Sequence, residues 1–201
     1  AGKGDFFGPL VISAVYVNDE TKEKLKKVGV KDSKKLSDEQ INEIAEQIKL
    51  ICKNKFSIIN LIPSEYNKLY EKYKNLNKLL SHAHSVVIND LLNKTKCKTV
   101  ITDKFSKKKL EIEEQKNHVD INFIKETKAE KYIGVAAASI LARNEFNKWF
   151  EQMEKKNLNL PKGSSIITEQ KAIEIVKNYS TKLNEICKLH FKTLNKAKTN
   201  V

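Results

Sequence analysis

Hydrophobic and polar positions along the chain follow two periodicities, which predict alternating strands and helices. Short apolar runs rich in β-branched residues indicate buried strands, and they occupy residues 10–17, 56–62, 98–103 and 119–124. Stretches in which apolar residues recur every three or four positions indicate amphipathic helices. These stretches follow Ser37 and Pro63, and others occupy residues 75–93, 135–154, 168–177 and 181–196. The polar segment 18–27 predicts only a helical turn.

Several local patterns indicate which residues start the helices and which face the core. Ser37 and Gln40 are spaced as a capping box, in which each side chain accepts a hydrogen bond from the other residue's backbone. The apolar face of the helix that follows carries Ile41, Ile44, Ala45 and Ile48. In the helix over 75–93, the residues predicted to face inward are Leu79, Leu80, Ala83, Val86, Val87, Leu91 and Leu92. In the strand over 98–103 they are Val100 and Ile101.

The order of these elements predicts an α/β fold. Strands predominate at the start, strands and helices alternate in the middle, and helices alone close the chain. Such an order favours a mixed β-sheet flanked by helices, with a helical C-terminal part. Because 201 residues suffice for one sizeable core, residues 1–201 are predicted to form a single domain.

A run of small residues, Ala136 to Ser139, lies near the start of the helix over 135–154, and Glu130 precedes that helix by about one turn. Small side chains let a backbone approach another helix or a ligand closely. An acid at the mouth of such a helix can hold a metal ion beside the ligand. A tightly packed core helix preceded by a solvated glutamate would show the same pattern, so both interpretations stay open.

The charge of the chain favours a polyanionic partner. Lys and Arg total 38 against 25 Asp and Glu, which gives a formal net charge of +13. Nucleic acid is the first candidate and an anionic membrane surface the second, while a lysine-rich solvated surface would give the same balance. Arg143 is the only arginine. Because guanine edges are usually read by arginine, this composition favours contacts with the phosphate backbone over sequence readout.

The cysteines and the hydropathy argue against two other classes of protein. Cys52, Cys97 and Cys187 lie far apart and show no CxxC spacing, so they are predicted to be reduced thiols of a cytoplasmic protein and not zinc ligands. No run approaches the roughly 18 apolar residues that a membrane span needs.

Several motifs occur in one order along the chain. They are Gly2-Lys3-Gly4, Asp32-Ser33-Lys34-Lys35, Val100-Ile101-Thr102-Asp103, Thr127-Lys128-Ala129-Glu130 and Lys188-Leu189-His190-Phe191. Together they resemble the type 2 ribonuclease H family from residue 1 to about residue 196. Tyr66-Asn67-Lys68-Leu69-Tyr70 and Leu189-His190-Phe191-Lys192 favour its ribonuclease HIII branch over the HII branch. The resemblance implies the ribonuclease H-like fold.

The same resemblance implies a metal-dependent endoribonuclease that hydrolyses the RNA strand of RNA/DNA hybrids with two divalent ions, Mg²⁺ or Mn²⁺. Asp103 and Glu130 match metal-binding catalytic acids of the family. The position of Asp103 alone allows two interpretations. It is either an acid that faces a cleft at the sheet edge or a residue that forms a turn. Because such cations prefer carboxylate oxygens, the histidines are not needed as ligands.

The resemblance also implies residues that contact the nucleic acid. Gly2, Lys3 and Gly4 match a loop that presents backbone groups to the ribonucleotide 2′-hydroxyl, which distinguishes RNA from DNA. Residues without a Cβ allow that approach, although any tight turn can use them. The resemblance also implies that Ser33, Lys34 and Lys35 form a loop that contacts phosphates of the DNA strand. The alternative is that these residues form only a solvated turn. Further candidates of this kind are Ser139 and Ser164.

The start of the chain departs from the family pattern. In the family, an Asp-Glu pair and one small residue precede the glycine loop, and here Ala1 is that small residue. We therefore expect an N-terminally truncated catalytic domain that lacks two of four acids and the family's separate N-terminal substrate-binding domain. By itself it is expected to have little nuclease activity.

Several properties stay open at this stage. We expect a cytoplasmic monomer without an obligate protein partner. The alternatives are a ribonuclease HII-type enzyme acting on embedded ribonucleotides and a non-catalytic, basic nucleic-acid-binding domain. The sequence indicates neither the organism nor the preferred metal.

Overall fold

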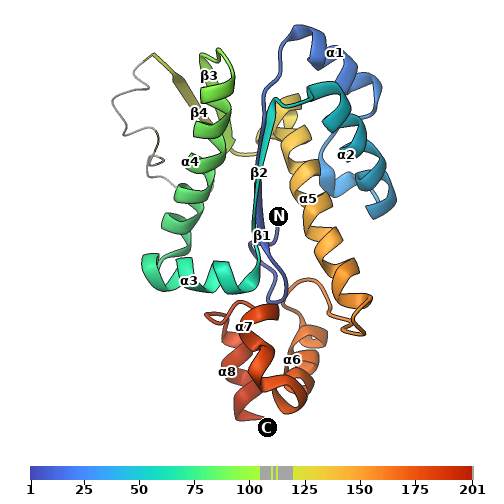
Figure 1. Cartoon of the computed structure of the whole chain (residues 1–201), viewed down its shortest axis with the longest axis vertical. Helices are drawn as coiled ribbons and strands as arrows, with labels where there is room; N and C mark the ends of the chain where they lie inside the picture. The colour runs from blue at the N-terminus through green and yellow to red at the C-terminus, as the bar shows by residue number, and fades with distance from the viewer. Residues whose placement is uncertain (105–109, 111, 113–119, 201) are drawn as a thin grey trace. The chain divides into compact units, whose positions relative to one another are not determined.

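The computed structural model describes residues 1–104, 110, 112 and 120–200 (Figure 1). The chain divides into two compact units. Unit 1 comprises residues 1–11, 60–75 and 145–201, and unit 2 comprises residues 12–59 and 76–144. In the part of the chain that is described, no helix is long and apolar enough to cross a membrane.

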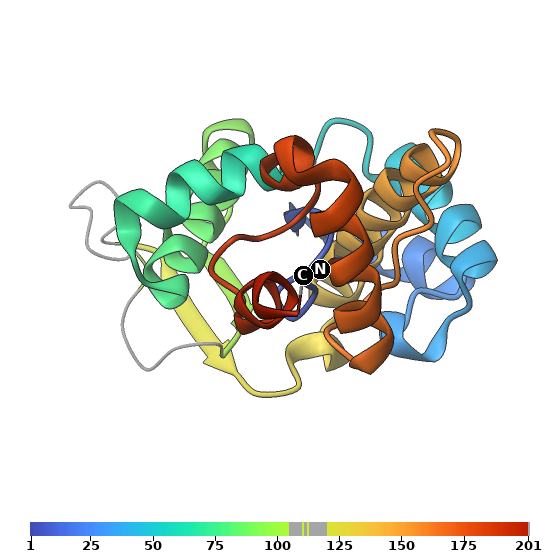
Figure 2. The same ribbon diagram turned by 90° about the horizontal axis from the view of Figure 1, so that it is seen from below.

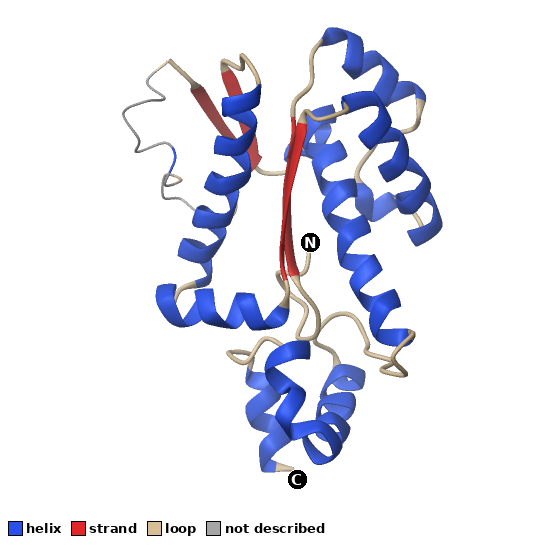
Figure 3. Ribbon diagram, in the orientation of Figure 1, coloured by secondary structure: helices blue, strands red, loops and turns tan. Residues whose placement is uncertain are grey.

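Helices and short strands make up both units (Figure 3). The elements shared by the two units are strand β1 (Leu10–Val15), strand β2 (Phe56–Leu61) and helix α5 (Ile133–Glu154). Unit 2 also contains α1 (Asp19–Lys27), the 3₁₀ helix η1 (Ser33–Lys35), α2 (Asp38–Cys52), α4 (Leu76–Lys94), β3 (Thr99–Asp103), β4 (Asn122–Glu126) and the 3₁₀ helix η4 (Ala129–Lys131). Unit 1 also contains α3 (Pro63–Tyr73), α6 (Ile166–Tyr179), the 3₁₀ helix η5 (Ser180–Lys182), α7 (Leu183–Ile186) and α8 (Lys192–Thr199).

Two strand pairs form the sheet structure of the described residues. The N–H of Tyr16 donates to the carbonyl of Lys55 at 2.9 Å, so the end of β1 lies beside the start of β2 and these strands run antiparallel. Strands β3 and β4 are parallel, with Thr99 opposite Asn122 and Asp103 opposite Glu126. Parallel and antiparallel pairs flanked by helices confirm the α/β class.

The core of unit 2 explains the small-residue run. Ala136, Ala137 and Ile140 of α5 are buried against the apolar face of α2, which begins with the predicted capping box. A Cβ added at Gly134 would lie 3.3 Å from Val17, and the Ser13 hydroxyl donates to the Ala138 carbonyl. The small residues therefore allow close packing of α5 on α2 and on the β1 segment.

In helix α4 one predicted core position is wrong. Val86 is 42% exposed, while Ser85 and Ile88 are buried. The Ser85 hydroxyl accepts a hydrogen bond from the N–H of Ile112 at 3.1 Å, so Ile112 contacts α4 outside its main apolar stripe. Helical periodicity cannot indicate this contact, because Ile112 is distant from Ser85 in sequence.

The strand predictions need two smaller corrections. Val100 and Thr102 are buried while Ile101 is only partly buried, because alternate residues of a strand face the same side. The strand predicted at 119–124 is displaced to β4 (Asn122–Glu126), and residue 119 lies outside the described residues. The segment 18–27 forms a full helix, α1 (Asp19–Lys27), because its N-cap Asn18 makes a capping box with Thr21.

The long C-terminal helix predicted at 181–196 is wrong. It is divided into η5, α7 and α8, and residues 187–191 are not helical (Figure 2). The Lys188 N–H donates to the Phe6 carbonyl at 2.9 Å, and Cys187 forms a β-bridge with Phe7. Pairing with the N-terminal segment replaces intrahelical hydrogen bonds, so tertiary contacts override the helical pattern here.

His84 of α4 makes stability sensitive to acid. Burial lowers the pKa of His84 from 6.5 to about 4. Between these values the unfolded chain binds a proton that the folded chain does not, so the free energy of unfolding falls as the pH decreases from 6.5 towards 4, by at most about 3 kcal/mol. Urea unfolding at pH 7 and pH 4.5 should show a smaller loss for His84→Leu than for the parent chain. Equal losses would contradict this assignment.

Candidate active site

Asp103 is placed by the end of a strand. It is the last residue of β3, it is exposed, and parallel pairing sets it opposite Glu126 of β4. Register partners in a sheet point to the same face. The carboxylates of Asp103 and Glu126 therefore project from one side of this strand pair, at its C-terminal edge.

Glu130 is placed by the 3₁₀ helix η4. Lys128 adopts the left-handed conformation with φ of 57°, which turns the chain after β4 into η4. Ala129 is fully buried and fixes η4, while the Glu130 side chain keeps 20% of its surface exposed. Because η4 contacts β3, the structure brings the two predicted acids onto neighbouring elements of unit 2.

Glu126 is an acid that the sequence analysis missed. Its carboxylate accepts hydrogen bonds from Lys131 at 2.5 Å and from the Tyr132 hydroxyl at 3.3 Å. The hydrogen bond from Lys131 holds the pKa of Glu126 below its ordinary value. Lys131 and Tyr132 therefore both bind the carboxylate of Glu126. Its proximity to Asp103 depends on the strand register, which the sequence does not indicate.

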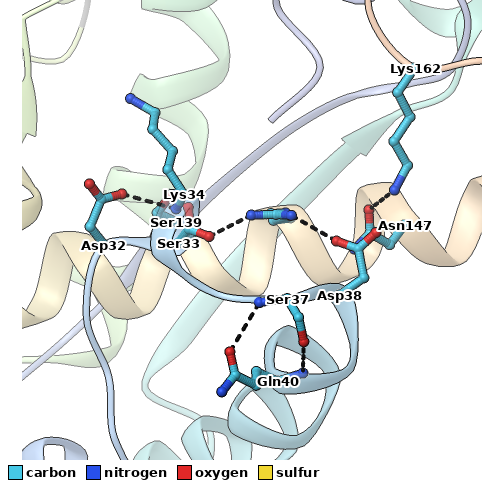
Figure 4. Close-up of polar contacts among 10 residues, drawn as sticks. Asp32, Ser33, Lys34, Ser37, Asp38, Gln40, Ser139, Asn147 and Lys162 are labelled. Atoms are coloured by element: carbon cyan, nitrogen blue, oxygen red, sulfur yellow. Dashed lines mark hydrogen bonds and ion pairs between the residues drawn. The ribbon is translucent and has the colours of Figure 1, made fainter.

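The loop before α2 carries the predicted phosphate contacts. The Asp32 carboxylate accepts the Lys34 N–H at 3.0 Å and starts η1. Ser33 is buried, and its hydroxyl lies 2.7 Å from that of Ser139 on α5 (Figure 4). Lys34 and Lys35 are exposed. Ser33 and Ser139 thus hold the loop against α5, while the side chains of Lys34 and Lys35 stay on the surface.

Lys34 links this loop to the acids. Its ammonium group lies 3.8 Å from the Glu130 carboxylate, although the Lys34 side chain is 81% exposed. Such an exposed ion pair contributes little stability. The distance places the Lys34 ammonium group beside the Glu130 carboxylate within unit 2.

The glycine loop lies in unit 1 and is held at Gly2. Gly2 has a φ of +86°, and a Cβ there would lie 2.0 Å from the Pro9 carbonyl oxygen and 3.1 Å from Phe146. By contrast, a Cβ at Gly4 would meet no atom within 4 Å. Lys3 and Gly4 are exposed while Gly2 is buried. A side chain at Gly2 would therefore be strained and would clash, whereas Gly4 has open space around it.

Asp5 joins two of the predicted contact regions. Its carboxylate accepts the Gly163 N–H at 2.6 Å, and the Phe6 N–H donates to the Gly163 carbonyl at 3.0 Å. These bonds place the exposed Ser164 in a loop that adjoins the segment after Gly4. Within unit 1, the structure thus brings together the glycine loop and the loop containing Ser164.

A buried lysine supports the same segment. The Lys188 ammonium group donates to the carbonyls of Asp5 and Gly8 at 2.8 and 2.7 Å. Burial lowers the pKa of Lys188 to about 8, and Asp5 opposes that shift. The sequence showed Lys188 only as part of a motif and gave no signal of this role.

The chemistry of Asp103 and Glu130 fits a hard divalent cation. Both supply carboxylate oxygens, both keep exposed surface, and oxygen ligands are those that Mg²⁺ and Mn²⁺ prefer. Over the described ranges, no group of three or more His, Cys, Asp and Glu side chains is placed to hold a metal ion. We therefore treat the two acids as two ligands of a larger set.

The fold and this arrangement agree with the comparison to known families. A family model described as ribonuclease HII matches residues 1–194, and the chain belongs to that family. The resemblance to type 2 ribonucleases H inferred from the motifs is thereby confirmed.

Similar proteins from the HIII branch match nearly the whole chain. Ribonuclease HIII of Protochlamydia amoebophila (strain UWE25) is 43% identical over 198 residues, which cover 97% of this chain and 65% of that protein. The crystal structure of Bst-RNase HIII in complex with Mn²⁺ has a TM-score of 0.88 at 31% identity and covers 100% of this chain and 67% of that one. For Aquifex aeolicus RNase H3 the TM-score is 0.74 at 31% identity, with 94% and 69% covered. The chain therefore spans about two thirds of the length of these relatives.

Proposed function

We propose that residues 1–201 form the catalytic part of a metal-dependent endoribonuclease that hydrolyses the RNA strand of RNA/DNA hybrids. The observation that carries the proposal is the position of Asp103, at the end of β3 and beside the element that holds Glu130. A basic loop pairs with the same Glu130. Carboxylates beside a phosphate-binding surface repel the ligand unless they hold cations, so a purely binding domain would gain nothing from them.

Each candidate residue has a proposed role. Asp103 and Glu130 hold the divalent ions, Mn²⁺ or Mg²⁺, and we expect two of them. When bound, such ions activate water and neutralise charge on the phosphate. Clustered carboxylates without these ions repel each other, which is why we expect the site to bind metal before or together with the nucleic acid.

Substrate recognition is assigned to two further groups. The backbone of Gly2, Lys3 and Gly4 contacts the 2′-hydroxyl of the ribonucleotide. Lys34 and Lys35 contact phosphates of the DNA strand, and Ser33 and Ser139 hold their loop. Ser164 contacts the backbone from the loop that Asp5 fixes. Because the cations are lysines, binding should depend steeply on salt and little on base sequence.

The proposal is tested by adding the two acids that the family pattern places before Ala1. An extended chain with Asp-Glu directly before Ala1 should cleave the RNA of a labelled hybrid at least about 100-fold faster than residues 1–201, because positioned metal ions supply most of the rate. The same chain extended by Asn-Gln is the matched control and should stay slow. Equal rates for all three proteins would contradict the proposed acid set.

Two other functions make different predictions. A ribonuclease HII-type enzyme would cut a DNA duplex that contains a single ribonucleotide at least as fast as a continuous hybrid. A non-catalytic binding domain would bind the hybrid and release no product with either metal. We propose a cytoplasmic monomer without an obligate protein partner, and sedimentation at micromolar concentration tests the monomer.

A further inference from the structure

The single arginine of the chain lies at the basic loop. Arg143 extends from α5 and donates from one nitrogen to the Ser33 carbonyl at 2.5 Å and from another to the Asp38 carboxylate at 2.8 Å. Ser33 is the first residue of η1, and Asp38 is the first residue of α2. One side chain therefore holds both ends of the segment that carries Lys34 and Lys35.

This geometry requires arginine. The guanidinium group is planar and presents several donors in a rigid fork, so it can bind two acceptors that lie in different directions. Lysine offers a single ammonium group on a flexible stem. Every other Lys or Arg residue of this sequence is a lysine. The one arginine therefore stands where a planar fork of donors is used.

The segment needs this support because its own helix is short. The η1 helix is three residues long, and 3₁₀ helices of that length are marginal by themselves. Leu36 is buried in the core of unit 2 and anchors the C-terminal end of η1. The Ser33–Ser139 hydrogen bond anchors its start. Between these two anchors, the side chains of Lys34 and Lys35 are exposed, so their placement depends on how firmly the backbone of the segment is held.

We propose that Arg143 is a positioning residue for nucleic-acid binding. It fixes the loop so that Lys34 and Lys35 are already ordered when the phosphate backbone of the nucleic acid binds. The proposal rests on the proposed function of this surface. Ordering the loop in advance lowers the entropic cost of binding. Arg143 has 30% of its side chain exposed and donates from two of its nitrogens to protein acceptors, so it acts through the loop.

The test is hybrid binding as a function of salt, measured by fluorescence anisotropy with a fluorescent RNA/DNA hybrid. Arg143→Lys keeps the charge but loses the fork. We expect it to weaken binding about tenfold at low salt and to reduce the slope of log K against log salt by about one, because one phosphate contact is lost. Asp38→Asn keeps Arg143 and weakens its outer contact, and we expect a smaller change in the same direction.

Thermal unfolding of each variant separates this role from a structural one. A structural role alone would lower the melting temperature and leave the salt slope of the folded protein unchanged, which would overturn the proposal. If Arg143→Lys fails to fold, the salt slope of Asp38→Asn decides in the same way. If the parent chain does not bind the hybrid at any salt concentration, the proposed function fails and the positioning role with it. Binding by the parent together with unchanged slopes in both variants overturns the positioning role alone.

Discussion

Replacing Asp103 by Asn in the chain extended by Asp-Glu is expected to abolish RNA cleavage, while affinity for the hybrid falls less than about tenfold. The substitution is nearly isosteric but removes the charge that a hard cation needs. Asp103 is exposed at the end of β3, so the change should cost little stability. Gel analysis of a labelled hybrid in Mn²⁺ measures the rate, and fluorescence anisotropy with the divalent ion present measures binding.

The matched control for this substitution is Asp120→Asn, which changes an exposed acid in the turn before β4. It should leave the cleavage rate within about twofold of the parent, since surface substitutions away from a site are usually near neutral. Near-normal turnover of Asp103→Asn would remove Asp103 from the metal site. Equal loss in both variants would show that any reduction of negative charge slows the protein.

The two glycines of the N-terminal loop should respond to alanine in opposite ways. Gly2→Ala places a Cβ 2.0 Å from the Pro9 carbonyl oxygen at a φ of +86°. We expect it to lower the free energy of unfolding by on the order of 3 kcal/mol, through backbone strain and displacement of Pro9 or Phe146. Urea unfolding followed by circular dichroism measures this loss.

Gly4→Ala is its matched counterpart, because an added Cβ at Gly4 meets no atom within 4 Å. Its stability should change by less than about 0.5 kcal/mol. Because the backbone at Gly4 is proposed to contact the ribose, Gly4→Ala in the chain extended by Asp-Glu should lower the rate of RNA cleavage about tenfold. A loss of that size corresponds to the free energy of about one hydrogen bond. A stable Gly4→Ala variant with unchanged cleavage would contradict the proposed role of this loop. A stable Gly2→Ala variant would contradict the packing described around Gly2.

Periodicity was sufficient for the elements that depend on local sequence. The capping box at Ser37, the strand after Pro9 and the helix after Pro63 all lie where the pattern predicts them. Each is decided by residues within a few positions of one another. The prediction of one long C-terminal helix is wrong for the opposite reason. Lys188 forms a hydrogen bond with Phe6, which is far away in the sequence.

The candidate site shows the same division. Asp103 and Glu130 were found through motifs and strand ends, and the structure places them on contacting elements. Glu126 was missed because its position beside Asp103 depends on the register of two strands. The sequence shows Arg143 only as the single arginine, and its contacts with Ser33 and Asp38 depend on the fold. Residues whose role arises from long-range pairing carry no local signal.

Labelling each strand in turn and comparing substrates tests whether the protein hydrolyses the RNA strand of RNA/DNA hybrids. The chain extended by Asp-Glu is incubated with a continuous RNA/DNA hybrid, the matching DNA duplex and the single-stranded RNA, in Mn²⁺ and in a chelator. We expect internal cuts in the RNA strand of the hybrid alone, and only with the metal present. Cleavage of the DNA strand, equal cleavage of single-stranded RNA, or cleavage that persists in the chelator would contradict it.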